Sequence, residues 1–243
     1  MASIATKSHK EFLRQPETSV GRKLAPPPKS LRDLAYHRIK HLIVTGLLKP
    51  GDYINEAVLS ARLGIGRTPV HQAMDRLVGD AFVEVIPRKG IVIRSLSLDE
   101  IFQTLDVRLL NETAAAESAA DRADPSEIEA LKRLLELFAQ AAQKADFERM
   151  MYLDREFHLI IAHASDNPVL AEVLRGLHDR ASRFWLASVR APMRYDDILR
   201  EHNAIVEAIA GRDKQAASST MRRHIESARN NLVRHLSMFE SAN

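Results

Sequence analysis

Residues 46–70, GLLKPGDYINEAVLSARLGIGRTPV, decide the fold of the first part of this 243-residue chain. The Pro-Gly pair at 50–51 predicts a tight turn. Asn55 follows it and offers a capping side chain for a short helix, which is expected to end at Gly64. A further helix is predicted over about 67–78, because a proline in its first turn is favourable. The stretch therefore predicts two short helices joined by a tight connection.

The flanking segments extend this pair into a larger unit. Upstream, apolar residues recur at three- and four-residue steps over 31–43, which indicates an amphipathic helix. Downstream, residues 82–86 and 91–94 flank a turn at 87–90 and predict a two-stranded hairpin. We therefore expect a winged helix-turn-helix over residues 30–95. Its third helix would enter the major groove of DNA, and its hairpin tip would reach phosphates or the minor groove.

Charge is distributed unevenly and supports a polyanion partner for the first part of the chain. Residues 1–98 hold 16 Lys and Arg against 8 Asp and Glu, whereas residues 99–243 hold 19 against 24. A basic module joined to a mildly acidic one is typical of nucleic-acid binding. The alternative is a chance excess of cations in a basic tail, residues 1–29, which end in APPPK and are expected to form a flexible arm.

The composition restricts which residues could bind a metal and indicates the cell compartment. The sequence holds no cysteine, which leaves histidines and carboxylates as the ligands of any metal. It has no apolar run of the roughly 18 residues that a membrane span needs, and its N-terminus is basic and polar throughout. A cytoplasmic protein without a membrane partner is the simplest interpretation.

The pattern after residue 96 is wholly helical. Ser97 and Glu100 form a capping-box motif, and Asp124 with Pro125 opens a second helix in a similar way. Four more helices are expected, separated by short connections that include a break at Ala191-Pro192. The predicted fold is therefore mainly α: an N-terminal winged helix-turn-helix followed by an all-α antiparallel six-helix bundle over 96–240.

Four polar residues within the bundle are spaced as metal ligands could be. Asp154 and His158 are four residues apart and share one helix face, whereas His202 and His224 lie on two later helices. One carboxylate and three imidazoles suit a divalent transition metal, zinc first, with nickel, iron or manganese as other candidates. The alternative for any single histidine is a hydrogen-bonded core residue. His163 points about 140° away from His158 and is excluded; His178 and His235 lack a comparable context and are expected on the surface.

The first unit resembles the DNA-binding domain of the GntR family of bacterial transcription regulators. The shared motifs are Gly-x-Leu-x-Pro-Gly at 46–51, Leu-Gly-x-x-Arg-Thr-Pro-Val at 63–70 and the Arg-Lys-Gly hairpin tip. The resemblance implies DNA contacts by the start of the recognition helix and by the wing, namely Arg67, Thr68, His71, Arg88, Lys89 and Gly90. The chain departs from the family pattern at Ala57, Gly66 and His71, of which His71 replaces an arginine, so the base sequence that it reads is expected to differ.

The second unit resembles the FCD effector domain of the FadR subfamily, and its six helices point to the shorter, VanR-like variant. The matching pieces include Val-Arg-x-x-x-Glu at 107–112, Asp-x-x-x-His at 154–158 and Met-x-x-His at 221–224. The resemblance implies metal ligation by Asp154, His158, His202 and His224. Arg108 is expected to hold an effector carboxylate, with Arg183 as a second anion contact. The alternative for Arg108 is a salt bridge with Glu112 one helical turn away.

These expectations combine into a DNA-binding transcription regulator, more a repressor than an activator, and not an enzyme. It would bind a palindromic operator in double-stranded DNA as a homodimer, and a small organic-acid effector bound at the metal would modulate that binding. One alternative is a metal sensor, in which the metal itself is the effector. Another is a metalloenzyme with an Asp/His₃ site, but no free general base is evident beside the ligands.

Overall fold

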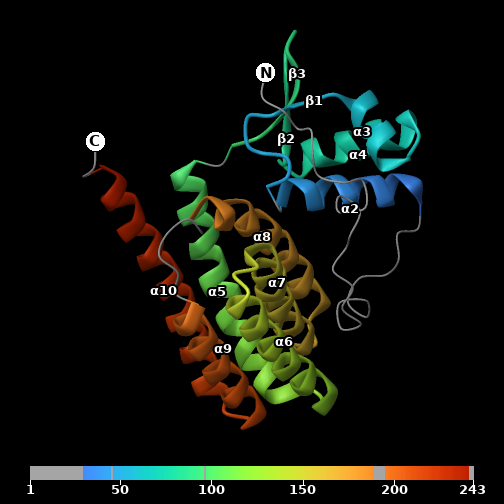
Figure 1. The fold of residues 1–243 in the computed structure, drawn as a ribbon. Coiled ribbons are helices and arrows are strands. Elements are labelled where there is room, and N and C mark those ends of the chain that lie inside the picture. The colour runs from blue at the N-terminus through green and yellow to red at the C-terminus, as the bar shows by residue number, and fades with distance from the viewer. Residues whose placement is uncertain (1–29, 45, 96, 189–194, 241–243) are drawn as a thin grey trace. The chain divides into compact units, whose positions relative to one another are not determined.

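The computed structural model describes residues 30–44, 46–95, 97–188 and 195–240 (Figure 1). The expected N-terminal arm and the break at Ala191-Pro192 lie outside these residues. The chain divides into two compact units between Ser95 and Leu96. Helices dominate both units, which confirms the mainly α fold class.

The first unit is a winged helix-turn-helix with three helices and a small sheet. Its elements follow in the order α2 (Leu31–Val44), β1 (Tyr53–Ile54), α3 (Glu56–Leu63), α4 (Arg67–Gly79), β2 (Val83–Ile86) and β3 (Gly90–Ile93). The side chain of Asn55 accepts hydrogen bonds from the backbone of Ala57 and Val58, and Gly64 ends α3 at a φ of 65°, in the left-handed region. Gly66, at the start of α4, provides no side-chain cap.

The wing has three strands, where the sequence predicted two. The strand order is β1-β3-β2, and Tyr53 and Ile54 of β1 pair antiparallel with Val92 and Ile91 of β3. Two residues cannot show a period-2 pattern, so β1 is not visible in the sequence. It forms because the chain leaving the 50–52 turn reaches the free edge of the hairpin: Gly51 donates to the Ile93 carbonyl, and Ile93 donates to the Asp52 carbonyl, both at 2.9 Å.

One apolar core holds this unit together. α2 packs across α4, and the buried faces of both helices meet the inner sides of β2 and β3. The residues of this core that are least exposed are Ala35, Ile39, Val70, Ala73, Met74, Leu77 and Ile93. Burial of one face of α4 leaves its opposite face exposed.

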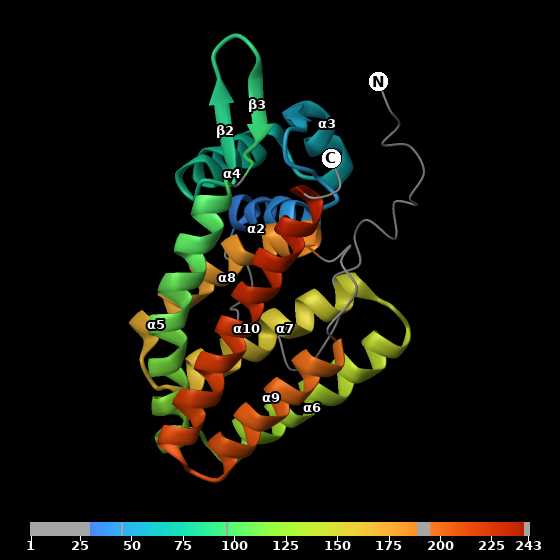
Figure 2. The ribbon, with the colours of Figure 1, turned by 90° about the vertical axis from the view of Figure 1, so that its left-hand side faces the viewer.

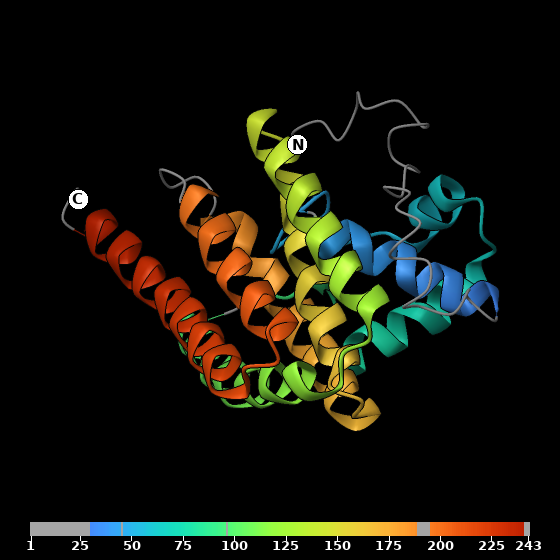
Figure 3. The same cartoon turned by 90° about the horizontal axis from the view of Figure 1, so that it is seen from below.

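The second unit consists, in the part that is described, of six helices: α5 (Leu98–Arg122), α6 (Pro125–Gln143), α7 (Phe147–Ala164), α8 (Pro168–Ser188), α9 (Tyr195–Ala210) and α10 (Lys214–Glu240). Both expected capping boxes are present, Ser97 with Glu100 and Asp124 with Glu127. α5 contacts α7, α8, α9 and α10, and it runs beside α10 in Figure 2. Figure 3 shows α9 between α10 and α6, and α9 contacts both. α5 therefore contacts each of α7, α8, α9 and α10.

No helix in the described part of the chain is long and apolar enough to cross a membrane.

Candidate metal centre and DNA-reading surface

The exposed face of α4 carries the residues expected at DNA. Arg67, Thr68 and His71 are all exposed, with Arg67 and His71 one helical turn apart. Arg88, Lys89 and Gly90 are exposed at the turn between β2 and β3. Gly90 has a φ of 98° and Arg88 a φ of 66°, and the Lys89 amide donates to the Ile86 carbonyl at 3.0 Å, so the backbone at this tip is turned tightly.

His71 has a carboxylate partner that the sequence analysis missed. Its Nδ1 lies 3.1 and 3.2 Å from the two carboxylate oxygens of Glu56, at the start of α3, and its Nε2 lies 3.9 Å from Asp75. The hydrogen bond and charge of Glu56, with the charge of Asp75, raise the pKa of His71. The ring therefore stands on the reading face among acids, and no local sequence pattern links positions 56 and 71.

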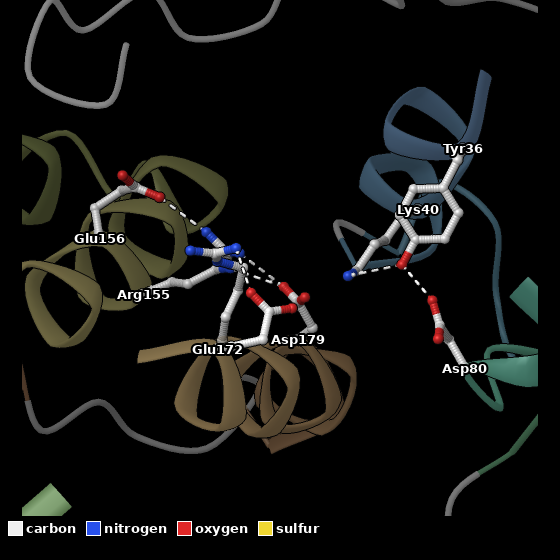
Figure 4. A network of polar contacts seen from close by, with 8 residues as sticks. Tyr36, Lys40, Asp80, Arg155, Glu156, Glu172 and Asp179 are labelled. Atoms are coloured by element: carbon white, nitrogen blue, oxygen red, sulfur yellow. Dashed lines mark hydrogen bonds and ion pairs between the residues drawn. The ribbon is translucent and has the colours of Figure 1, made fainter. Parts of the chain in front are cut away.

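A polar network fixes the end of α4 against α2 (Figure 4). The Tyr36 hydroxyl donates to Asp80 at 2.5 Å, and Lys40 donates to the same hydroxyl oxygen at 3.1 Å. The guanidinium carbon of Arg76 lies 3.8 Å from the centre of the Tyr36 ring, a cation–π distance. These contacts orient the recognition helix, α4, on α2.

The four predicted ligands come together from three helices. Asp154 and His158 lie on α7, His202 on α9 and His224 on α10, and one ligand atom from each lies within 4.8 Å of all the others. The three histidines are buried, with residue exposures of 2%, 1% and 6%, and Asp154 is half-buried. His202 Nε2 is 3.4 Å from His224 Nε2 and 3.5 Å from Asp154 Oδ1.

The donor set fits a divalent metal on three observations. Both ring nitrogens of the buried His158 have no hydrogen-bond partner within the described structure, so the lone pair of this ring is available to a metal. The 3.4 and 3.5 Å separations are close to the edge of about 3.3 Å expected between ligand atoms 2.0–2.1 Å from a tetrahedral zinc. Burial, with His224 and His158, holds the pKa of His202 well below its ordinary value, so its ring is neutral and able to coordinate.

A second buried cluster lies against the first and shares His158. His158 Nδ1 is 2.5 Å from Glu112 Oε2, and His178 Nε2 is 3.1 Å from Glu112 Oε1. His178 is 2% exposed, so the expectation that it lies on the surface is wrong. It follows the buried Leu174 by four residues and precedes the buried Ala181 by three, so the apolar periodicity of α8 was the signal that could have placed it inside. His235, on α10, lies outside the side chains that the structure describes.

Ionisation within this second cluster follows from burial and from Arg108. Burial, followed by the charge of Arg108, lowers the pKa of His178 to about 3. Burial alone would raise the pKa of Glu112, but Arg108, His158 and His178 together hold it well below its ordinary value. Glu112 is therefore an anion, and His178 is a neutral ring beside it.

Arg108 forms a salt bridge with Glu112, which the sequence offered as the alternative to effector binding. Its Nε lies 2.6 Å from Glu112 Oε1, and both side chains are buried. This bond uses one of the five guanidinium N–H groups and leaves the Nη nitrogens as candidates for an anion. Arg183 lies on α8, but its side chain is outside those described. His163 is exposed and contacts Glu127, and it is not part of either cluster.

An ion-pair network ties α7 to α8 beside these clusters (Figure 4). Arg155 donates from Nε and Nη2 to Asp179 Oδ1 at 3.0 and 2.8 Å, and from Nη1 to Glu156 at 2.8 Å. Arg155 is adjacent in sequence to Asp154, and Asp179 is adjacent to His178. The network therefore fixes the register of the two helices that carry Asp154, His158 and His178.

A winged helix-turn-helix joined to an all-helical unit is the architecture of a class of DNA-binding transcription regulators. Two family models match: "Bacterial regulatory proteins, gntR family" over residues 31–93 and "FCD domain" over residues 103–227. The chain belongs to the GntR family and, through its FCD domain, to the FadR subfamily.

Relatives and solved structures agree with this assignment. The HTH-type transcriptional regulator YdhC of Bacillus subtilis is 29% identical over 190 residues, which cover 78% of this chain and 85% of YdhC. The HTH-type transcriptional repressor RspR of Escherichia coli is 23% identical over 200 residues, covering 82% and 88% of the two chains. The structure of E. coli McbR/YncC covers 86% of this chain and 99% of its own, with 24% identity and a TM-score of 0.77, and shows the same fold. The relatives are regulators and not enzymes, as expected for this chain.

Proposed function

We propose that the protein is a metal-dependent repressor whose operator binding is modulated by a small carboxylate effector in the FCD domain. The observation that carries the proposal is the buried cluster of Asp154, His158, His202 and His224. Its donor atoms are spaced for a tetrahedral divalent ion, and zinc fits best. The six helices α5–α10 support the shorter, VanR-like form of the domain.

The effector is proposed to bridge the metal and Arg108. Three imidazoles and one carboxylate leave room for a further ligand on a metal that expands its coordination, and a carboxylate oxygen is a suitable donor. Arg108 lies beside this site through Glu112, and its Nη nitrogens provide a charged fork for the second oxygen. An effector bound in this way would share the Arg108 guanidinium with Glu112, which contacts its Nε.

DNA is proposed to be read by the exposed face of α4 and the wing. Arg67 would read a guanine edge or a phosphate from the start of the helix, and Thr68 and His71 would lie along the same groove. Arg88 and Lys89 would contact phosphates, with Gly90 allowing a close backbone approach. A palindromic operator would require two such heads, and we infer a homodimer that acts in the cytoplasm.

Repression is favoured because two relatives, RspR of Escherichia coli and the gluconate operon regulator of Bacillus subtilis, are transcriptional repressors. A metal sensor is the second candidate, because the Asp/His₃ cluster supports metal binding before any effector is considered. The two differ in what the metal alone does to operator binding.

Titration of operator DNA by metal-free, zinc-loaded and zinc-plus-carboxylate protein separates these functions. An effector-modulated repressor binds in the zinc-loaded state and is released by the carboxylate, whereas a metal sensor changes its affinity with zinc alone. His202→Ala should remove zinc and the effector response, with His163→Ala on the same unit as the matched exposed control. Arg67→Ala should remove specific operator binding and leave the zinc content unchanged, with Arg133→Ala as its control. Release of the operator by carboxylate in EDTA-treated protein would contradict the metal-centred proposal.

A further inference from the structure

Two of the three imidazoles at the candidate metal site have a carboxylate beside their Nδ1 nitrogen. His224 Nδ1 forms a hydrogen bond of 2.9 Å with Glu201 Oε2, whereas His158 Nδ1 lies 2.5 Å from Glu112 Oε2 in an ion-pair contact without hydrogen-bond angles. Glu112 comes from α5 and Glu201 from α9, so neither carboxylate shares a helix with the imidazole that it contacts. Neither belongs to the group of four candidate ligands around Asp154.

We propose that Glu112 and Glu201 are positioning residues that fix the tautomer and orientation of His158 and His224. A neutral imidazole carries one proton, and a carboxylate at Nδ1 holds that proton there because it can only accept. The lone pair is then left on Nε2 of each ring. This inference rests on the proposed metal site, in which Nε2 would be the donor atom of both rings.

The third imidazole is held by a different interaction. The ring of His202 stacks on Phe157, with centroids 4.0 Å apart and planes at 14°, and it meets Phe138 edge-on at 6.1 Å. Its Nε2 lies 3.4 Å from His224 Nε2, so both nitrogens converge on the same point. Aromatic packing thus orients one ligand, and charge orients the other two.

Glu112 is better suited to this supporting role than to a second metal site. Glu112, His158 and His178 do form a group with metal-ligand spacing. However, Glu112 Oε1 already lies 2.6 Å from the Arg108 guanidinium, and a divalent cation there would meet this fixed positive charge. Glu112 therefore contacts Arg108, His158 and His178 within one buried cluster.

Glu112 and Glu201 should differ in how strongly they support metal binding. The Glu112 side chain is 2% exposed and is contacted from α5, α7 and α8, whereas the Glu201 side chain is 21% exposed. A buried acceptor held on several sides has fewer alternative positions, and water cannot replace it. Loss of Glu112 should therefore weaken metal binding more than loss of Glu201.

Imidazole nitrogen spectra of metal-free, ¹⁵N-labelled full-length protein test the tautomers directly. In the wild type, both His158 and His224 should carry the proton on Nδ1. Glu112→Ala should change the spectrum of His158 and leave His224 unaltered, and Glu201→Ala should do the reverse, so each variant is the control for the other. Glu112→Gln retains an accepting oxygen and the shape of the side chain, so it should keep the proton of His158 on Nδ1 and serves as the conservative control. If Glu112→Ala fails to fold, the wild-type tautomers and the Glu201→Ala spectrum decide the proposal.

Competition with a chelating indicator for Co²⁺ gives the second measurement. Loss of a supporting carboxylate should weaken Co²⁺ binding roughly 10- to 100-fold, with the larger loss at Glu112. Glu117→Ala on α5 and Glu207→Ala on α9 alter exposed glutamates of the same helices and should leave the affinity within about twofold of the wild type. A proton on Nε2 of His158 or His224 in the wild type, or unchanged Co²⁺ affinity in the Glu112 and Glu201 variants, would overturn the proposal. If the wild type binds no Co²⁺, the proposed function fails instead, and the tautomers of the metal-free protein still decide the positioning role.

Discussion

Mild acid should destabilise the metal-free helical unit because His178 is buried as a neutral ring. Its pKa is lowered from 6.5 to about 3 in the folded protein, by burial first and then by Arg108. A group with a depressed folded pKa stabilises the fold fully above its unfolded pKa, and that stability is lost as the pH falls toward the folded pKa. Between pH 7 and pH 5 the unfolded chain binds a proton that the folded chain does not, which lowers the free energy of unfolding by about 2 kcal/mol.

His202 acts in the same direction, since its pKa is also lowered, first by burial. Glu156 acts in the opposite direction, because burial raises its pKa. Comparison with His178→Gln isolates the contribution of His178 and cancels that of the other groups. The variant should lose about 2 kcal/mol less stability than the wild type between pH 7 and pH 5.

Urea unfolding followed by the fluorescence of the single tryptophan provides the assay, because Trp185 lies on α8 with His178. The measurement requires metal-free protein, since a bound metal would add its own dependence on pH. Equal losses of stability in the wild type and in His178→Gln would refute the conclusion that His178 is neutral and buried.

Three further changes probe packing, capping and the buried ion pair. Leu77→Ala removes a fully buried side chain from the first unit and should cost about 2–5 kcal/mol of stability, measured by thermal unfolding. Ser97→Ala removes the side chain that accepts from the Glu100 backbone and should lower the stability of the helical unit by about 1 kcal/mol in urea, whereas Ser97→Asp should retain it. Arg108→Met leaves the carboxylate of Glu112 buried without its cation, and should cost about 3–5 kcal/mol; a loss below about 1 kcal/mol would show that the pair is not buried as described.

The candidate ligands could be predicted because they are spaced within and between amphipathic helices. Asp154 and His158 share a helix face through a spacing of four, and no tertiary information is needed to see it. Glu201 and Glu112 could not be assigned a role in the same way, since each contacts an imidazole on another helix. The partner of His71 was missed for a related reason: Glu56 lies 15 positions earlier, on α3.

The amino-acid sequence by itself determined the helices, their caps, the recognition helix and the four candidate ligands. These features depend on local periodicity, on capping side chains and on motifs, which act over a few residues. The tertiary structure alone decided that β1 completes the wing and that Glu112 contacts His158 and His178. These contacts link residues 37 to 66 positions apart, and only the packing of whole helices and strands sets such distances.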